Sequence, residues 1–407
     1  MADKVTPISI KGRYLWKGED RFVINGVVYQ PYKPSREGAF SIPDPLAEDQ
    51  LEDLEKSIPL FKELGINTLF VFFTNPAENH DEAMNMLAEA GIYVLTCLST
   101  PHRTIRRNAP FESYTADLLQ AYFQAIDCMA AYRNTLGVIV ADKVINWIPA
   151  TVAAPVIRAV TRDVKRYMAL AAEVAGQRVL PVGISCADVS CILEPQFAYF
   201  SAGREEEVID IFAFNCYLWA GNASMQISGY DILVKKFKDT HIPVFFSEYG
   251  ANTCSPRLFQ ETRAILSREM TDTFSGGITY KFFDGPNRFG LVQKQADGTL
   301  DRLADFKNLK ESVQACKDVR HNTLLEATTG AERRKLEMPA QSHSWKAEQT
   351  LPDCPLDWDK VREQIEDGQW VDVERDLLDL EVEDLAASVW ERFRTDVHEL
   401  LGLSLGT

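Results

Sequence analysis

The segment PVFFSEYGAN, residues 243–252, indicates the fold class of this chain. Its first four residues are apolar, without the alternation of apolar and polar residues that marks a strand with one face in water. A strand that is apolar throughout indicates a parallel sheet covered by helices. The apolar run is followed by Glu248, Tyr249 and Gly250, so a carboxyl group is expected at the edge of that sheet.

Seven more short runs rich in Val, Ile and Phe occur along the chain, separated by stretches with helical periodicity. Several of these stretches end in Gly before the next run, as expected of a helix C-cap. Eight such units in roughly 300 residues predict an α/β fold of the (β/α)8 TIM barrel type. The alternative is an open, doubly wound sheet, although no Gly-rich phosphate turn follows the first run. The seven runs are FVINGVVYQP (22–31), TLFVFFT (68–74), YVLTCLS (93–99), LGVIVADKV (136–144), VLPVGISCA (179–187), IFAFNCYLW (211–219) and GGITYKFFD (276–284).

The composition changes near residue 320. We assign residues 1–318 to the barrel and the polar residues 319–352, with scattered Gly, Pro and Ser, to a linker. Residues 353–407 are predicted to form a small acidic helical segment, because residues 351–401 carry 16 acidic and 5 basic residues. This segment is either a helical appendage packed on the barrel or an acidic tail that binds a protein partner.

Charge and hydropathy exclude several classes of partner. The 407 residues include 43 basic and 59 acidic residues, and the formal net charge of −16 argues against nucleic acid and anionic membrane surfaces as partners. No apolar run approaches the roughly 18–20 residues that a membrane span needs. The N-terminal stretch MADKVTPISIKG has no apolar signal core and the C-terminal stretch shows no lipid-anchor signal, so a cytoplasmic location is expected.

The eight cysteines are scattered, without a CxxC pair or a His/Cys cluster at zinc spacing. Several lie inside apolar runs and are interpreted as buried, reduced thiols. The sequence therefore predicts no metal site and no cofactor.

Candidate catalytic residues follow from the ends of the predicted strands, where barrels of this type place their active sites. Glu248 ends the seventh strand and suits a glycosidase nucleophile, because no basic residue adjacent in sequence explains it as a structural carboxylate. The fourth strand should present the general acid, and it ends in Asp142 followed by Lys143. The one basic cluster, PHRTIRRNAP (101–110), follows the third strand; it is either a solvated loop or a binding site for an anionic ligand.

Residues 5 to about 318 resemble the fungal β-1,3-glucanosyltransferases, glycoside hydrolase family 72, through many motifs in the same order. The resemblance implies a retaining double displacement with two glutamates, of which one matches Glu248. The other ends strand 4 in an Asn-Glu pair, which here is Asp142-Lys143, so a lysine stands at the acid/base position. The matching motifs include FVINGVVYQP, LGINTLFVFF, NPAENHDEAMNMLAEAGIYVL, NTLGVIVADKVIN, APVIRAVTRDVKRYM, IPVFFSEYGAN and FSGGITYKFF with FGLV.

Other positions also depart from the family pattern. The aspartate that the resemblance implies after strand 3 falls on Cys97, and the Arg-Val-Tyr of strand 2 has become Phe70-Val71-Phe72. Cysteines expected from the family fall on alanines, which agrees with a reducing compartment. The residues expected to line the ligand site, from the resemblance or as aromatic rim residues, are Gln30, Tyr29, Phe72, Cys97, Tyr217, Trp219, Tyr249 and Tyr280.

Lys143 changes the expected mechanism. A lysine, with an ordinary pKa near 10, leaves a poor base for the second half-reaction, and loss of acid/base assistance costs roughly 10²–10⁴ in rate. We therefore favour a pseudoenzyme that has lost transglycosylation and binds a glycan, such as β-glucan, or a partner in the barrel mouth. The alternatives are a repurposed enzyme that uses Lys143 and Glu248 for non-glycosidic chemistry, and residual β-1,3-glucan transglycosylation or hydrolysis. Lys143 and Glu248 are expected to face each other across the barrel mouth, close enough for a direct or water-bridged ion pair.

Overall fold

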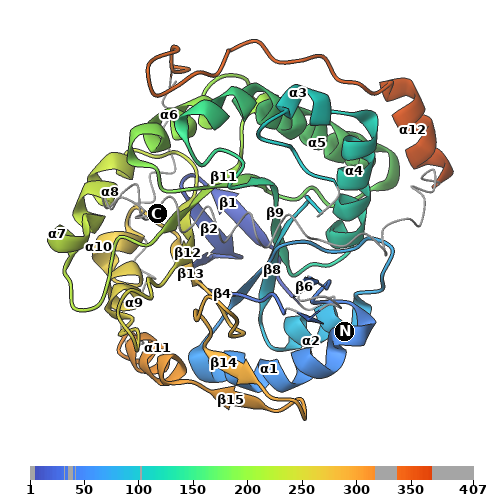
Figure 1. Ribbon diagram of the computed structural model, residues 1–407. Coiled ribbons are helices and arrows are strands. Elements are labelled where there is room, and N and C mark those ends of the chain that lie inside the picture. Colours follow the sequence, from blue (N-terminus) through green and yellow to red (C-terminus); the bar gives the residue numbers. More distant parts are fainter. Residues whose placement is uncertain are drawn as a thin grey trace, which may run out of the picture.

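The centre of the molecule is a closed barrel of eight parallel strands that follow one another around the ring in chain order (Figure 1). The structure, a computed structural model, describes residues 5–31, 33–34, 40–41, 43–100, 103–316 and 337–368. Each barrel strand coincides with one of the eight apolar runs, which confirms the predicted (β/α)8 TIM barrel. The strands are β4 (Ile24–Val28), β7 (Thr68–Val71), β8 (Tyr93–Cys97), β9 (Thr135–Asp142), β10 (Val182–Cys186), β11 (Ile211–Cys216), β12 (Val244–Tyr249) and β13 (Gly276–Thr279).

Helices surround the barrel, and their apolar faces pack against the outer side of the strands. The long helices α1 and α5 each end at a glycine in the left-handed conformation, Gly65 and Gly176, where a side chain would be strained. The described helices are α1 (Leu51–Leu64), α2 (Asp81–Glu89), α3 (Pro110–Ser113), α4 (Ala116–Ala130), α5 (Ala154–Ala175), α6 (Ser190–Ser201), α7 (Met225–Ser228), α8 (Tyr230–Phe237), α9 (Gln260–Ile265), α10 (Arg268–Thr271), α11 (Ala304–Gln314) and α12 (Trp358–Asp367), with 3-10 turns η2 (Glu48–Gln50), η3 (Ile148–Ala153) and η4 (Glu205–Glu207).

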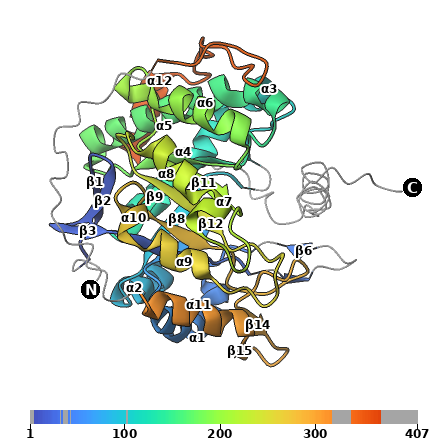
Figure 2. The ribbon, with the colours of Figure 1, turned by 90° about the vertical axis from the view of Figure 1, so that its left-hand side faces the viewer.

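A small antiparallel sheet, which the sequence did not predict, covers one end of the barrel (Figure 2). It consists of β1 (Ile8–Lys11), β2 (Tyr14–Lys17) and β3 (Asp20–Phe22). Its apolar side chains join the cluster that fills the barrel interior, and the Tyr93 hydroxyl donates to the Thr6 carbonyl at 2.6 Å. The carboxyl ends of the strands therefore point away from this sheet. Two further hairpins are β5 (Lys33–Pro34) with β6 (Phe40–Ser41), and β14 (Val292–Lys294) with β15 (Leu300–Arg302).

Residues 337–352, which the sequence assigns to the linker, pack against the barrel. The ring of Trp345 is fully buried, with its centroid 5.4 Å from that of Tyr199. The Tyr199 hydroxyl donates to the Glu348 carbonyl at 2.6 Å, and the Lys346 amide donates to Thr151 Oγ1 at 2.9 Å. We call residues 337–352 the C-terminal strap. The remainder of the predicted linker, residues 319–336, lies outside the described residues.

The first turns of the predicted acidic segment form α12, which packs on α5. The Asp357 side chain caps its N-terminus, and the Arg166 guanidinium lies 4.2 Å from the centroid of Trp358. This contact agrees with a packed appendage for residues 358–367. Residues 369–407, which carry the rest of the predicted helical segment, lie outside the described residues.

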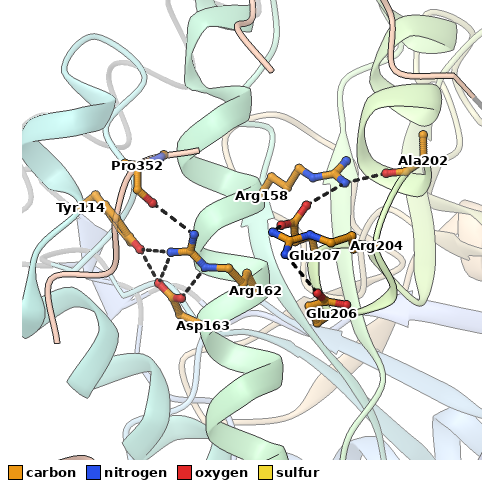
Figure 3. Close-up of polar contacts among 9 residues, drawn as sticks. All are labelled: Tyr114, Arg158, Arg162, Asp163, Ala202, Arg204, Glu206, Glu207 and Pro352. Carbon is orange, nitrogen blue, oxygen red and sulfur yellow. Dashed lines mark hydrogen bonds and ion pairs between the residues drawn. The ribbon is translucent and has the colours of Figure 1, made fainter. Parts of the chain in front are cut away.

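Buried charges on α5 tie this helix to its neighbours (Figure 3). The fully buried Arg158 donates to the carbonyl groups of Tyr199 and Ala202 and to Glu207 Oε2, the last at 3.2 Å. One turn along, Arg162 donates to Asp163 Oδ1 at 2.8 Å and to the carbonyl of Pro352, the last residue of the strap, at 3.2 Å. These contacts fix the segment after α6 and the C-terminal strap on the same side of the barrel.

All eight cysteines fall within the described residues and are free. Across the described part of the chain, no helix combines the length and the apolar character that crossing a bilayer requires. Within the same residues, no group of three or more His, Cys, Asp and Glu side chains is arranged to hold a metal ion.

Candidate functional site

The carboxyl ends of β9 and β12 bring together the three charged residues that the sequence singled out. Lys143 Nζ is in direct contact with Glu248 Oε1 and lies 2.9 Å from Asp142 Oδ2. The Glu248 side chain is 5% exposed and that of Lys143 is 30% exposed. The expected ion pair is therefore present, with Asp142 as a second carboxylate on the same ammonium group.

The backbone of Lys143 is held in the left-handed region, with φ of 52°, which is uncommon for a residue with a side chain. Its amide donates to the Ser185 carbonyl on β10 at 2.7 Å. The Lys143 carbonyl accepts from the Arg107 guanidinium at 2.8 Å, so a member of the basic cluster 101–110 holds the backbone of Lys143. Strained backbone of this kind persists when its surroundings fix it, and it is frequent at functional sites.

The second oxygen of Glu248 is held by neutral donors. Oε2 accepts from the Tyr217 hydroxyl at 2.7 Å and from Asn215 Nδ2 at 3.1 Å. Ser247 Oγ donates in turn to Asn215 Oδ1 at 3.0 Å, which orients the amide. Asn215 was not among the predicted site residues, although it is the polar residue in the otherwise apolar run at the end of the sixth strand.

The electrostatics of the ion pair keep the proton on Lys143. Burial lowers the pKa of the Lys143 ammonium, but the Asp142 and Glu248 carboxylates outweigh this effect and raise the pKa above its ordinary value. Burial raises the pKa of the Glu248 carboxyl, and Lys143 opposes that rise. A lysine protonated in this way is a donor, and it is neither a base nor a nucleophile at neutral pH.

Four predicted ligand-site residues lie around this ion pair or next to it. Lys143 Nζ lies 5.3 Å from the centroid of the Phe72 ring, and the Tyr217 hydroxyl donates a hydrogen bond to Glu248 Oε2. The Tyr280 ring packs 6.5 Å from that of Tyr217, centroid to centroid. Cys97 is buried inside the barrel, where burial and the charge of Asp142 raise the pKa of its thiol. These side chains form the wall of the barrel mouth beside Glu248.

The other predicted ligand-site residues are placed differently, which corrects the prediction for them. Tyr29, Trp219 and Tyr249 are buried in the core between the strands and the helices, not in the barrel mouth. Tyr29 packs on the ring of Phe61, and the Tyr249 hydroxyl is 3.0 Å from Thr262 Oγ1.

Trp219 packs edge-on against Tyr230, which completes its enclosure in that core.

Gln30 lies next to the mouth, but its side-chain amide is hydrogen-bonded to backbone groups. Its Nε2 donates to the Pro43 carbonyl at 2.8 Å, and its Oε1 accepts from the Phe72 amide at 3.2 Å. Gln30 therefore positions the chain beside Phe72.

Comparison with known proteins gives the family. The sequence model of the glucanosyltransferase family, glycoside hydrolase family 72, matches residues 1–317. The 1,3-beta-glucanosyltransferase gel1 of Aspergillus fumigatus is 39% identical over 312 residues, which cover 77% of this chain and 66% of gel1. The chain thus spans just under two thirds of that relative. PGA4 of Candida albicans, also named a 1,3-beta-glucanosyltransferase, is 37% identical over 354 residues, which cover 86% of this chain and 75% of PGA4.

Solved structures agree with this assignment. ScGas2 in complex with compound 6 superposes with a TM-score of 0.80 at 33% identity, covering 88% of this chain and 80% of that chain. A mutant of Saccharomyces cerevisiae Gas2p in complex with laminaritetraose and laminaripentaose superposes with a TM-score of 0.77 at 32% identity, covering 88% of this chain and 77% of that one. By sequence and by fold, this chain belongs to the glucanosyltransferase family, glycoside hydrolase family 72.

Proposed function

We propose that this chain is a glucanosyltransferase-like barrel that binds a β-1,3-glucan segment in its mouth without transferring it. The observation that carries the proposal is the contact between Lys143 Nζ and Glu248 Oε1. The ion pair occupies the carboxylate oxygen that a retaining enzyme needs as nucleophile. Binding of a glucan is supported by the Gas2p relative, whose structure holds laminaritetraose and laminaripentaose.

The proposed loss of transfer follows from the chemistry of retention. A retaining enzyme needs two carboxyl groups about 5 Å apart, one ionised as nucleophile and one protonated as acid, which then acts as base. Lys143 carries a proton that it could donate, but its raised pKa makes it unable to activate the incoming hydroxyl. Asp142 does not replace it, because its carboxylate contacts the same ammonium group.

The repurposed-enzyme alternative receives less support from this geometry. A lysine that attacks a carbonyl must first lose its proton. The two carboxylates within reach of Lys143 Nζ oppose that loss, since they stabilise the charged form. Residual transglycosylation is the alternative that the next experiment tests directly.

We expect the wild-type protein to bind laminaripentaose but not to elongate it into longer oligosaccharides. Binding is measured by titration calorimetry, and products are separated by anion-exchange chromatography after long incubation. Tyr280→Ala should weaken binding, because the ring belongs to the wall of the mouth, whereas Ile227→Ala, 78% exposed on α7, should not. Elongation by the wild type that Glu248→Gln abolishes would show a working active site and overturn the proposal. Absence of binding would show that a β-1,3-glucan segment is not the ligand.

Lys143→Glu is expected to give weak transglycosylation where the wild type has none. The change removes the cation that holds Glu248 and supplies a second carboxyl group at the position where the resemblance implies the acid/base. Activity should stay low, because Phe72, Cys97 and Asp142 keep the wall unlike that of the family pattern. The matched control is Lys143→Gln, which removes the charge without adding a carboxyl group. Equal activity of the two variants would contradict the acid/base argument.

A further inference from the structure

A second cluster of reactive side chains lies on the outer side of the barrel wall, where α2 meets α4. His80 directly precedes α2, Cys128 is in the last turn of α4, and Asp44 belongs to the segment before η2. None of the three residues touches Lys143 or Glu248 in the contacts described above. The cluster is thus separate from the site in the barrel mouth.

The three side chains form a continuous hydrogen-bonded chain. His80 Nε2 lies 2.7 Å from Asp44 Oδ2, and His80 Nδ1 lies 3.3 Å from Cys128 Sγ. The Asp44 carboxylate also accepts from the Asn75 amide at 2.6 Å and from the Leu46 amide at 2.9 Å. The two backbone donors hold the Asp44 carboxylate in place, and the carboxylate orients the His80 imidazole. As a result, His80 Nδ1 points at the Cys128 sulfur. The Asp44 carboxylate and the His80 imidazole are buried, whereas Cys128 is partly exposed.

The charges around the cluster favour an imidazolium. Burial lowers the pKa of His80, but the hydrogen bonds to Asp44 and Cys128 outweigh it and raise the pKa to about 10. Two other titratable groups lie close by, Asp81 and Tyr132, and the Tyr132 hydroxyl donates to Asp81 Oδ1 at 2.9 Å. Burial and this bond raise the pKa of Tyr132, so the phenol is neutral. Cys128 lies in the last turn of α4, and among the groups named here His80 is the cation that faces its sulfur.

We propose that His80 holds Cys128 as a thiolate and that this thiolate is a modification site for hydrogen peroxide. The arrangement is that of a cysteine activated by a histidine, which a carboxylate orients. The Cys128 thiolate attacks one peroxide oxygen, the S–O bond forms and the O–O bond breaks. The departing hydroxide takes a proton and leaves as water. Sulfur loses two electrons to give the sulfenic acid, and the peroxide is reduced.

Alkylation rates across a pH range test the thiolate. Intact protein is treated with iodoacetamide between pH 5.5 and 9, and the Cys128 peptide is quantified by mass spectrometry against the peptide of the exposed Cys254. An ordinary thiol loses reactivity about tenfold per pH unit below its pKa of about 8.5. We expect Cys128 to retain most of its rate down to pH 6, and to exceed Cys254 there by roughly tenfold after allowing for the lower nucleophilicity of a stabilised thiolate.

Two variants separate this role from a purely structural one. In His80→Gln and in Asp44→Asn, the pH profile of Cys128 should move to that of an ordinary thiol, even where either change loosens the fold. Treatment with hydrogen peroxide, followed by dimedone labelling, should mark Cys128 in the wild type and lose about tenfold in both variants. A wild-type profile that coincides with that of Cys254 would overturn the proposal. So would dimedone labelling that is unchanged in His80→Gln.

Discussion

Arg158→Met is expected to lower the free energy of unfolding by about 3–5 kcal/mol, the cost of removing one partner from a buried ion pair. The guanidinium is fully buried and holds two carbonyl groups, of Tyr199 and Ala202, in addition to Glu207. Methionine keeps the apolar stem but leaves these acceptors without their donor. Urea denaturation at pH 7 measures the loss.

The matched control is Arg204→Met, which removes a guanidinium from the same carboxylate. The Arg204 side chain is 70% exposed, so its pair with Glu207 should contribute less than about 1 kcal/mol. Equal effects of the two changes would mean that burial of Arg158 does not determine its contribution. The comparison thus separates the attraction between charges from the cost of leaving buried carbonyl groups unpaired.

Trp345→Ala is expected to lower the free energy of unfolding by about 3–5 kcal/mol, the usual cost of truncating a buried aromatic side chain. The Trp345 ring fills the space against Tyr199, and the neighbouring residues of the C-terminal strap bond to Thr151 and Tyr199. The strap should also become sensitive to limited proteolysis, because its main anchor is lost. Trp147→Ala, at a position 53% exposed, should change stability by less than about 0.5 kcal/mol. A strap that resists protease in Trp345→Ala would contradict the assigned anchor.

The barrel could be predicted because its strands are buried on both faces. Each therefore appears as a short apolar run, and all eight runs match strands. The β1–β3 sheet escaped prediction because its strands have three or four residues, too few for a periodicity to emerge. The C-terminal strap escaped prediction for another reason, since one tryptophan, Trp345, anchors an otherwise polar segment. The average composition of the segment does not reveal a contact made by one residue.

The site could be predicted only in part, because reading strand ends ignores the direction of side chains. Val28 lies inside the barrel, so the next residue, Tyr29, points outward into the helical layer. The same alternation directs Glu248 inward and Tyr249 outward. Applied to the sixth strand, it would have selected Asn215, which lies within β11 and donates to Glu248. Trp219 lies beyond the end of β11 at Cys216, where alternation no longer applies.

The backbone contacts of residue 143 also bear on how such a protein arises. Ser185 holds its amide and Arg107 holds its carbonyl, and neither contact involves the side chain. Lysine and glutamate codons differ by a single base. One mutation at this position therefore exchanges a carboxyl group for an ammonium group, and the two backbone contacts do not depend on which of them is present. Under the function proposed above, a family member would lose glucan transfer by one such change, and the reverse change would restore it fully only until the surrounding wall has diverged.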